Sequence, residues 1–350
     1  MIVLLLGVAQ TGVWAQRGFY ASQVYFNAAG KGFVLGDSGR LYTAPSAAGP
    51  WSMQVLSRAK GVPDLHGVHF PTADVGYIVG STTLLKTVDG GQTWTEPAST
   101  PFILGDVFFT SEKKGTATGL FVASYTEDGG MEWSNVSYSV TASNPTSFHD
   151  LVYFNDTDGV LVGNNGEILK TPGESIHPTP NDLKGVSFPT REVGYAVGEN
   201  GTILKTTDGG VTWKPQASGS EEDFADVFFL NANLGWVVGG FSSPAIFKTA
   251  DGGATWTEYK GSYGSFPYGS LNSVVFTDAN TGFAVGINFF LTTTDGGVTW
   301  KTAPAPQLSL YRGNRPASLR QSMQDGDALG RMLPSSTRPD QARQRVIFAR

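Results

Sequence analysis

Cysteine is absent from this chain of 350 residues, which excludes disulfides, thiolate zinc sites and cysteine nucleophiles together. Charged side chains are also scarce, at 15% of the sequence against about 25% in an average protein, which argues against coiled coils and other long-helix folds. Beyond the first residues, no apolar run approaches the roughly 18 residues that a membrane-spanning helix needs. The net charge of −6 gives no reason to expect a nucleic-acid partner.

The two ends of the chain differ in composition from its middle. Residues 307–350 hold eight arginines, three aspartates and no lysine, and carry +5, whereas the preceding 306 residues carry −11. We therefore predict a disordered, Arg-rich tail over residues 306–350, either solvated or used as a basic arm for an acidic partner. Residues 1–15 hold a short apolar run that ends in Val13, Trp14 and Ala15. This run favours a signal peptide, and a first β-strand is the alternative.

An extracytoplasmic location would fit three sequons for N-glycosylation. They begin at Asn135, Asn155 and Asn200.

Glycine is what the chain has in excess, with 45 residues, or about 13% against an average of roughly 7%. Many of these glycines belong to a Gly-x-x-x-Gly phrase that occurs seven times. The phrases lie at residues 32–36, 76–80, 115–119, 159–163, 194–198, 235–239 and 282–286. Each has turn residues on both sides, so it is too short for a membrane helix and predicts a short buried strand.

Each phrase stands in a longer repeated unit. Upstream lies a Val-x-Phe triplet, as at residues 186–188, and downstream lies a turn such as Asn165-Gly166 or Asn200-Gly201. Such pairs supply the positive φ angles of a tight hairpin turn. A further strand then leads into Thr-x-Asp-Gly-Gly-x-Thr-Trp, which we call the box segment. It is intact at 87–94, 206–213, 249–256 and 293–300, altered at 126–133, degenerate at 44–51, and lost after Thr171.

The repeat length identifies the fold class. The last glycines of successive phrases lie 35 to 47 residues apart, with an average of about 42, and each unit holds four short strands. These are the dimensions of a propeller blade. We therefore predict an all-β, seven-bladed β-propeller over residues 20–305, and we expect it to be monomeric.

The box segments resemble the Asp-box, or bacterial neuraminidase (BNR) repeat, which lies between the third and fourth strands of a blade. The aspartate can accept hydrogen bonds from turn amides, and the tryptophan can pack between blades. A catalytic site usually consists of different residues gathered at one place, whereas this turn is repeated in several blades. We therefore predict a structural role for the aspartates and tryptophans of the box segments. They are Asp89, Asp128, Asp208, Asp251, Asp295, Trp94, Trp133, Trp213, Trp256 and Trp300.

Residues 22–303 as a whole resemble the photosystem II stability/assembly factor family, most clearly at residues 194–213. This resemblance implies a seven-bladed Asp-box propeller of the thylakoid lumen. It also implies a non-enzymatic chaperone that binds the D1 reaction-centre precursor during assembly.

Strand order places the candidate binding site. Polar residues just before the Val-x-Phe triplets lie at the top of the innermost strands, around the channel mouth, within a one-residue shift in register. The same face receives the long crossing between residues 259 and 271, which is rich in aromatic residues and suggests a contact surface. The predicted binding residues are His66, Asp106, Asp150, Lys184, Asp226, Asn272, Tyr263, Phe266 and Tyr268.

The enzymatic alternative is a secreted glycan-binding or glycosidase-type propeller. A glycosidase needs two carboxyl groups roughly 5–10 Å apart, and Asp106, Asp150 and Asp226 are the candidates. His66 and His69 lie three apart on a strand and so face opposite sides, which argues against a metal pair. We expect no catalytic residues, no metal and no cofactor, and a protein or peptide as the partner.

Overall fold

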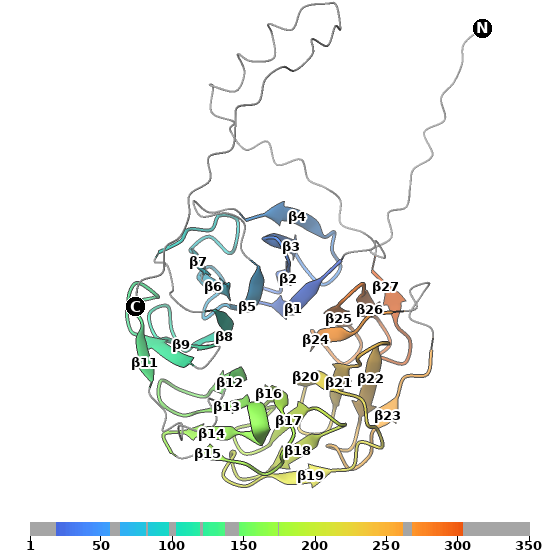
Figure 1. Ribbon diagram of the computed structural model, residues 1–350. Helices are drawn as coiled ribbons and strands as arrows, with labels where there is room; N and C mark the ends of the chain where they lie inside the picture. The colour runs from blue at the N-terminus through green and yellow to red at the C-terminus, as the bar shows by residue number, and fades with distance from the viewer. Residues whose placement is uncertain are drawn as a thin grey trace, which may run out of the picture. The chain divides into compact units, whose positions relative to one another are not determined.

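The computed structural model describes residues 19–56, 64–81, 83–97, 103–119, 122–136, 147–173, 175–261 and 268–303. All of them belong to one compact unit, which spans residues 1–309. This unit is the predicted seven-bladed β-propeller, with seven sheets arranged around a central channel (Figure 1). The only helical element in the described part is a single 3-10 turn, η1 (Asn164–Gly166).

Each blade is an antiparallel meander of consecutive strands, with the first strand beside the channel (Figure 1). Blade 1 contains β1 (Ala21–Phe26), β2 (Gly32–Gly36), β3 (Arg40–Ala44) and β4 (Ser52–Val55); blade 2 contains β5 (Leu65–His69), β6 (Gly76–Gly80) and β7 (Thr83–Thr87); blade 3 contains β8 (Leu104–Phe109), β9 (Gly115–Gly119), β10 (Val122–Thr126) and β11 (Ser134–Val136).

The remaining four blades follow the same plan. Blade 4 contains β12 (Phe148–Tyr153), β13 (Gly159–Gly163), β14 (Ile168–Thr171) and β15 (Ser175–Ile176); blade 5 contains β16 (Leu183–Ser187), β17 (Gly194–Gly198), β18 (Ile203–Thr206) and β19 (Lys214–Gln216); blade 6 contains β20 (Phe224–Phe229), β21 (Gly235–Gly239), β22 (Ala245–Thr249) and β23 (Thr257–Glu258); blade 7 contains β24 (Leu271–Phe276), β25 (Gly282–Gly286), β26 (Phe290–Thr293) and β27 (Lys301–Thr302).

Blade 2 departs from the four-strand expectation. Its sheet has three strands, and the only sign of a fourth among the described residues is an isolated bridge between Lys86 and Thr95.

The Gly-x-x-x-Gly phrases form the second strand of every blade, as predicted, and each of these strands is completely buried. Blade 5 shows why glycine is needed at both ends. A Cβ on Gly194 would lie 2.4 Å from the Phe188 ring, and one on Gly198 would lie 1.9 Å from the carbonyl oxygen of Asp182. The first strand therefore packs so closely on the second that no larger residue fits.

Aromatic pairs join neighbouring blades. The residue after the first glycine of the phrase stacks on the phenylalanine of the next blade's first strand. The ring centroids are 3.5 Å apart for Tyr77 and Phe109, and 3.6 Å apart for Tyr195 and Phe229. Because each stack crosses a blade boundary, the blades share their cores.

The ring closes between blades 7 and 1 through backbone contacts instead of a shared sheet. Tyr20 forms a bridge with Ile287, and the backbone N–H of Asn288 donates to the Phe19 carbonyl over 2.8 Å. Two side chains reinforce this seam, since Asn272 Nδ2 donates to the Ala21 carbonyl and Ser273 Oγ accepts from the Val24 N–H.

The box segments form tight turns in which the aspartate gathers hydrogen bonds. In blade 5, Thr206 Oγ1 and the Thr212 N–H both donate to Asp208 Oδ1, over 2.7 and 2.9 Å. Thr212 Oγ1 donates to Oδ2, so these bonds hold the pKa of Asp208 down to about 2. Trp213 meets Phe188 edge-on, with ring centroids 5.8 Å apart.

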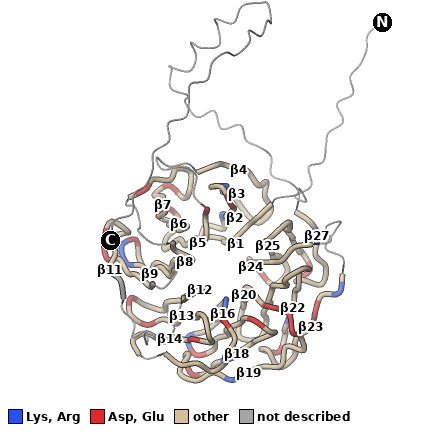
Figure 2. Tube along the Cα trace, viewed as in Figure 1, with Lys and Arg blue, Asp and Glu red and all other residues tan. Residues whose placement is uncertain are grey.

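The hairpin turns also have the predicted geometry. Asn165 and Asn200 adopt φ angles of 55° and 53°, and the glycine that follows each is also at positive φ. None of the described helical residues forms a helix long and apolar enough to cross a membrane. Acidic segments are spread over most of the blades (Figure 2).

Candidate binding site at the channel mouth

A β-bulge near the start of every first strand creates the candidate site. The pairing register shifts at this point in all seven blades, as between Leu183 and Gly185 in blade 5. Because a bulge places two residues opposite one, two successive positions of each blade face the channel mouth, and in blades 2, 3 and 5 one of the two is a glycine. The predicted polar residues accordingly divide into two rows. His66, Lys184 and Asn272 lie in the bulge, whereas Asp106, Asp150 and Asp226 lie one place further along.

Blade 4 corrects one detail of the sequence analysis. The triplet that pairs like the Val-x-Phe of other blades is Leu151-Val152-Tyr153, since Tyr153 faces Gly159 as Phe109 faces Gly115. A match to the Val-x-Phe pattern alone selects residues 152–154, which are shifted by one position because Leu151 stands in the place of the valine and Phe154 follows Tyr153.

The bulge row donates hydrogen bonds across blade boundaries. Ser22 Oγ donates to the Leu65 carbonyl over 2.8 Å, and Asn272 Nδ2 donates to the Ala21 carbonyl over 2.9 Å. His66 Nδ1 lies 2.7 Å from the Leu104 carbonyl oxygen. Because a carbonyl only accepts, this nitrogen of His66 carries the proton.

The second row accepts hydrogen bonds from the next blade. Asp150 Oδ2 accepts from the Val186 N–H over 2.7 Å, and Asp226 Oδ2 accepts from the Val274 N–H over 2.8 Å. Gln23 Oε1 does the same for the Val68 N–H. These polar side chains therefore join first strands to one another around the channel.

The three aspartates form a cluster of half-buried carboxyl groups at the pocket. Burial raises the pKa of Asp226 to about 7, helped by the charge of Asp150. Burial also raises the pKa values of Asp106 and Asp150, which share a hydrogen bond that favours the proton on Asp150. The pair therefore titrates as a unit. A proton is retained here at pH values where exposed carboxyl groups have lost theirs.

Lys184 is the only lysine or arginine among the described residues that line the mouth. Its Nζ lies 2.9 Å from Asp182 Oδ2 and 3.6 Å from Glu199 Oε1, so its charge is balanced locally. His149 lies beside it, with Nε2 3.4 Å from the Lys184 amine and 2.5 Å from Asn164 Oδ1. Burial and, to a smaller extent, the nearby Lys184 amine lower the pKa of His149.

The mouth forms a pocket of about 260 Å³ that brings together the six predicted polar residues, and Tyr20 and His149 also line it. Of the predicted aromatic residues, Tyr268 is 71% exposed, whereas Tyr263 and Phe266 lie outside the described residues. No group of three or more His, Asp or Glu side chains in the described ranges is arranged to hold a metal ion.

An exposed apolar patch lies next to this pocket on the same face. Phe241 is 86% exposed in the β21–β22 turn. The neighbouring Ser242 carbonyl accepts from the Gly269 N–H, which places Tyr268 beside that turn. The patch continues to Ile287, which pairs with Tyr20 at the mouth. We call Tyr20, Phe241, Tyr268 and Ile287 the aromatic patch.

Sequence reasoning missed Phe241, Ile287, Tyr20 and His149. One signal for Phe241 was available, because blade 6 has Phe-Ser-Ser-Pro at residues 241–244 where blades 1, 4 and 5 have a short Asn-Gly or Ser-Gly turn.

The comparisons with known proteins agree with this architecture. The family model described as "Photosynthesis system II assembly factor YCF48" matches residues 175–263, a region that contains blades 5 and 6. No curated protein sequence matches the chain.

Two solved structures of YCF48 have the same fold. YCF48 bound to D1 peptide is 18% identical, with a TM-score of 0.64, and the match covers 80% of this chain and 94% of that one. YCF48 from Cyanidioschyzon merolae is 15% identical, with a TM-score of 0.65 and coverages of 80% and 97%. The family model therefore confirms the resemblance to the photosystem II assembly factor family over residues 175–263, and the two structures show that the fold is shared.

An enzyme shares the fold as well. The GH74 xyloglucanase from Xanthomonas campestris is 13% identical, with a TM-score of 0.66, and the match covers 83% of this chain but 55% of that one. This chain thus spans about half the length of the xyloglucanase. At such low identities, the likeness shows a shared fold.

Proposed function

We propose that this chain is a non-catalytic propeller that binds a polypeptide segment across its channel mouth, as an assembly factor for photosystem II. The proposal places it outside the cytoplasm, at or in the thylakoid lumen. Its partner would be a reaction-centre subunit precursor such as D1. The YCF48 structure that holds a D1 peptide supports this class of partner.

The observation that carries the proposal is the aromatic patch beside the polar mouth. Phe241 and Tyr268 are large and exposed, and a backbone hydrogen bond joins the segments that carry them. They offer anchors of the kind that dominate protein interfaces. A patch of this kind on a soluble protein commonly marks a contact surface. Tyr20 connects it to the mouth, where buried polar groups can orient a bound backbone.

The carboxyl cluster is a poor match for a glycosidase. Asp106 and Asp150 interact directly with one another, so the pair titrates as a unit. Asp150 and Asp226 are also occupied by the Val186 and Val274 N–H groups. A structural role in joining blades accounts for these residues without catalysis.

The two described arginines do not form a binding cluster. Arg40 Nη1 lies 2.5 Å from Asp37 Oδ1, and Arg191 pairs with Asp158 and stacks over Phe154. The proposed contact surface is therefore aromatic and polar instead of basic.

Two assays test the proposal together. The purified chain is incubated with sialosides, xyloglucan and β-glucans, and overlapping peptides that cover D1 are screened for binding. We expect no glycan turnover and at least one bound peptide. Turnover that is abolished by Asp106→Asn or Asp226→Asn would instead establish a glycosidase.

A further inference from the structure

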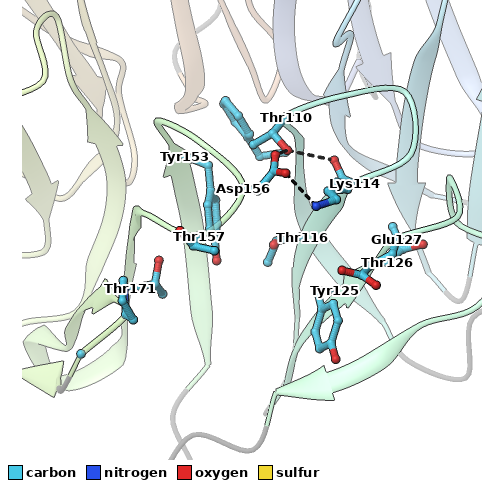
Figure 3. A pocket seen from close by; sticks show the side chains of 14 residues that line it. Thr110, Lys114, Thr116, Tyr125, Thr126, Glu127, Tyr153, Asp156, Thr157 and Thr171 are labelled. Carbon is cyan, nitrogen blue, oxygen red and sulfur yellow. Dashed lines mark hydrogen bonds and ion pairs between the residues drawn. The ribbon is translucent and has the colours of Figure 1, made fainter.

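A second pocket lies between blades 3 and 4, on the face opposite the channel mouth. It has a volume of about 510 Å³, and its walls come from the β8–β9 turn, β9 and β10 of blade 3 and from Tyr153, residues 156–157 and residues 171–173 of blade 4. Figure 3 shows Tyr153 and Tyr125 on two sides of this space, with Thr116 between them.

The pocket exists because blade 4 lacks a box segment. Only three residues, 172–174, connect β14 to β15, whereas seven residues, 207–213, connect β18 to β19 in blade 5. The threonine that begins each box is still present as Thr171. Without an aspartate to bind, its Oγ1 instead accepts a hydrogen bond from the Gly159 N–H over 2.9 Å.

At each of the other six boundaries between blades, a tryptophan side chain fills the space that corresponds to this pocket. Trp94, Trp133, Trp213, Trp256 and Trp300 each meet the phenylalanine of their own first strand edge-on, with interplanar angles of 84° to 89°. Trp51 packs similarly between blades 7 and 1. Among the described residues, the boundary between blades 3 and 4 has no tryptophan.

Three neighbouring positions change together at this boundary. Thr116 stands where blades 2, 5 and 6 have Tyr77, Tyr195 and Trp236. Tyr153 replaces the phenylalanine. Tyr125 replaces a lysine, since Lys205, in the same place in blade 5, donates to the Gly252 carbonyl of the next box. All three changes enlarge the space or place aromatic surface around it.

We propose that this pocket, hereafter the blade 3–4 pocket, binds an indole ring. The ring would occupy the place of the missing box tryptophan, with Tyr153 at its edge, Tyr125 at the opening and Thr116 at the floor. Hydroxyl oxygens of Thr116 and Thr171 offer acceptors for the indole N–H, as the Gly210 carbonyl does for Trp213. At the rim, Lys114 and Asp156 neutralise one another across 2.8 Å, which leaves Glu127 as the remaining charged residue of the lining and disfavours an anionic ligand.

Two probes distinguish a free aromatic molecule from a tryptophan side chain of a polypeptide. One is N-acetyl-tryptophanamide, and the other is a capped peptide that copies residues 206–214, with its Trp→Ala version as the control. Binding to the full chain is measured by ligand-observed NMR. We expect the amide to bind with a Kd on the order of 0.1–1 mM. A peptide at least about five-fold tighter than the amide indicates a polypeptide ligand, and equal affinities indicate a small aromatic one.

Matched variants test whether the probes occupy the blade 3–4 pocket. Thr116→Tyr restores the ring found in blades 2 and 5, so it should abolish binding and raise the unfolding temperature. Thr116→Ser keeps the space and the hydroxyl, and should bind like the wild type. Tyr125→Lys restores the lysine of other blades at an exposed position, and should weaken binding by about five-fold or more.

Two results would overturn the proposal. One is the absence of binding by both probes. The other is binding to the Thr116→Tyr variant with unchanged affinity. If Thr116→Tyr does not fold, unchanged binding to Tyr125→Lys overturns the proposal in the same way. Neither result bears on peptide binding at the channel mouth, which lies on the opposite face.

Discussion

Asp226 in blade 6 accepts a hydrogen bond from the backbone N–H of Val274 in blade 7, with 2.8 Å between Oδ2 and the nitrogen. An amide oxygen in the place of Oδ2 would still accept this bond, and the amide NH2 would then face the Val227 N–H, which donates to Oδ1 over 2.7 Å. The carboxyl group adds a cost, because burial and the charge of Asp150 raise its pKa to about 7.

The first prediction concerns Asp226→Asn. Between pH 3.8 and about 7, the folded state keeps a proton that the unfolded state has lost, so the free energy of unfolding falls as pH rises. The Asp226→Asn substitution keeps an acceptor for the Val274 N–H and removes the pH dependence that Asp226 gives to the free energy of unfolding. We expect it to stabilise the protein by a few kcal/mol at pH 8 and little at pH 4, measured by urea unfolding at both values.

Asp226→Ala serves as the control, because it removes the charge and the acceptor together. Leaving the Val274 N–H unsatisfied costs roughly 1–3 kcal/mol, so this variant should be less stable than Asp226→Asn at every pH. Equal stability of the two variants would show that the hydrogen bond contributes nothing.

The second prediction concerns the box segment of blade 5. Trp213→Ala should cost about 3–5 kcal/mol, as expected for a buried aromatic residue, and Asp208→Ala should cost roughly 1 kcal/mol through loss of its turn hydrogen bonds. Val211→Ala, in the same turn but exposed, should be nearly neutral. Thermal unfolding of the three variants gives the order. A stable Trp213→Ala that loses partner binding would instead assign the box a binding role.

The third prediction is acid sensitivity. The pKa values of Asp89, Asp208, Asp251 and Asp295 are lowered to about 2, chiefly by threonine hydroxyl and backbone N–H donors. Their stabilising effect is therefore present above pH 3.8 and is lost as pH falls towards 2. Asp208→Asn should flatten the stability profile below pH 4. An unchanged slope would mean that this carboxylate gains nothing from its donors.

The architecture was predictable because the same sequence unit recurs in every blade of a propeller. Seven glycine phrases specify seven second strands, since only glycine fits where Gly198 contacts the Asp182 carbonyl. The fourth strand of blade 2 was not predictable in detail, because outer strands are short and make few specific contacts.

The mouth was predictable in part. Their position along the first strand was enough to place Asp106, Asp150 and Asp226 at the channel. The sequence does not reveal the β-bulge, so it could not show that His66 and Lys184 lie in a different row from these aspartates. The aromatic patch depends on contacts between segments far apart in sequence, such as Tyr20 and Ile287. The blade 3–4 pocket follows from the loss of the box segment after Thr171, which the sequence shows but from which no pocket was predicted.

The most direct test of the proposed function is a calorimetric titration of a D1 peptide identified by the screen. The double variant Phe241→Ser/Tyr268→Ala is compared with Val211→Ser/Val298→Ser, which removes two exposed side chains from the opposite face. We expect the first variant to weaken binding by at least about ten-fold, because anchor residues contribute over 1 kcal/mol each, and the second to bind like the wild type. Equal affinity of the wild type and the Phe241/Tyr268 variant would contradict peptide binding at the aromatic patch.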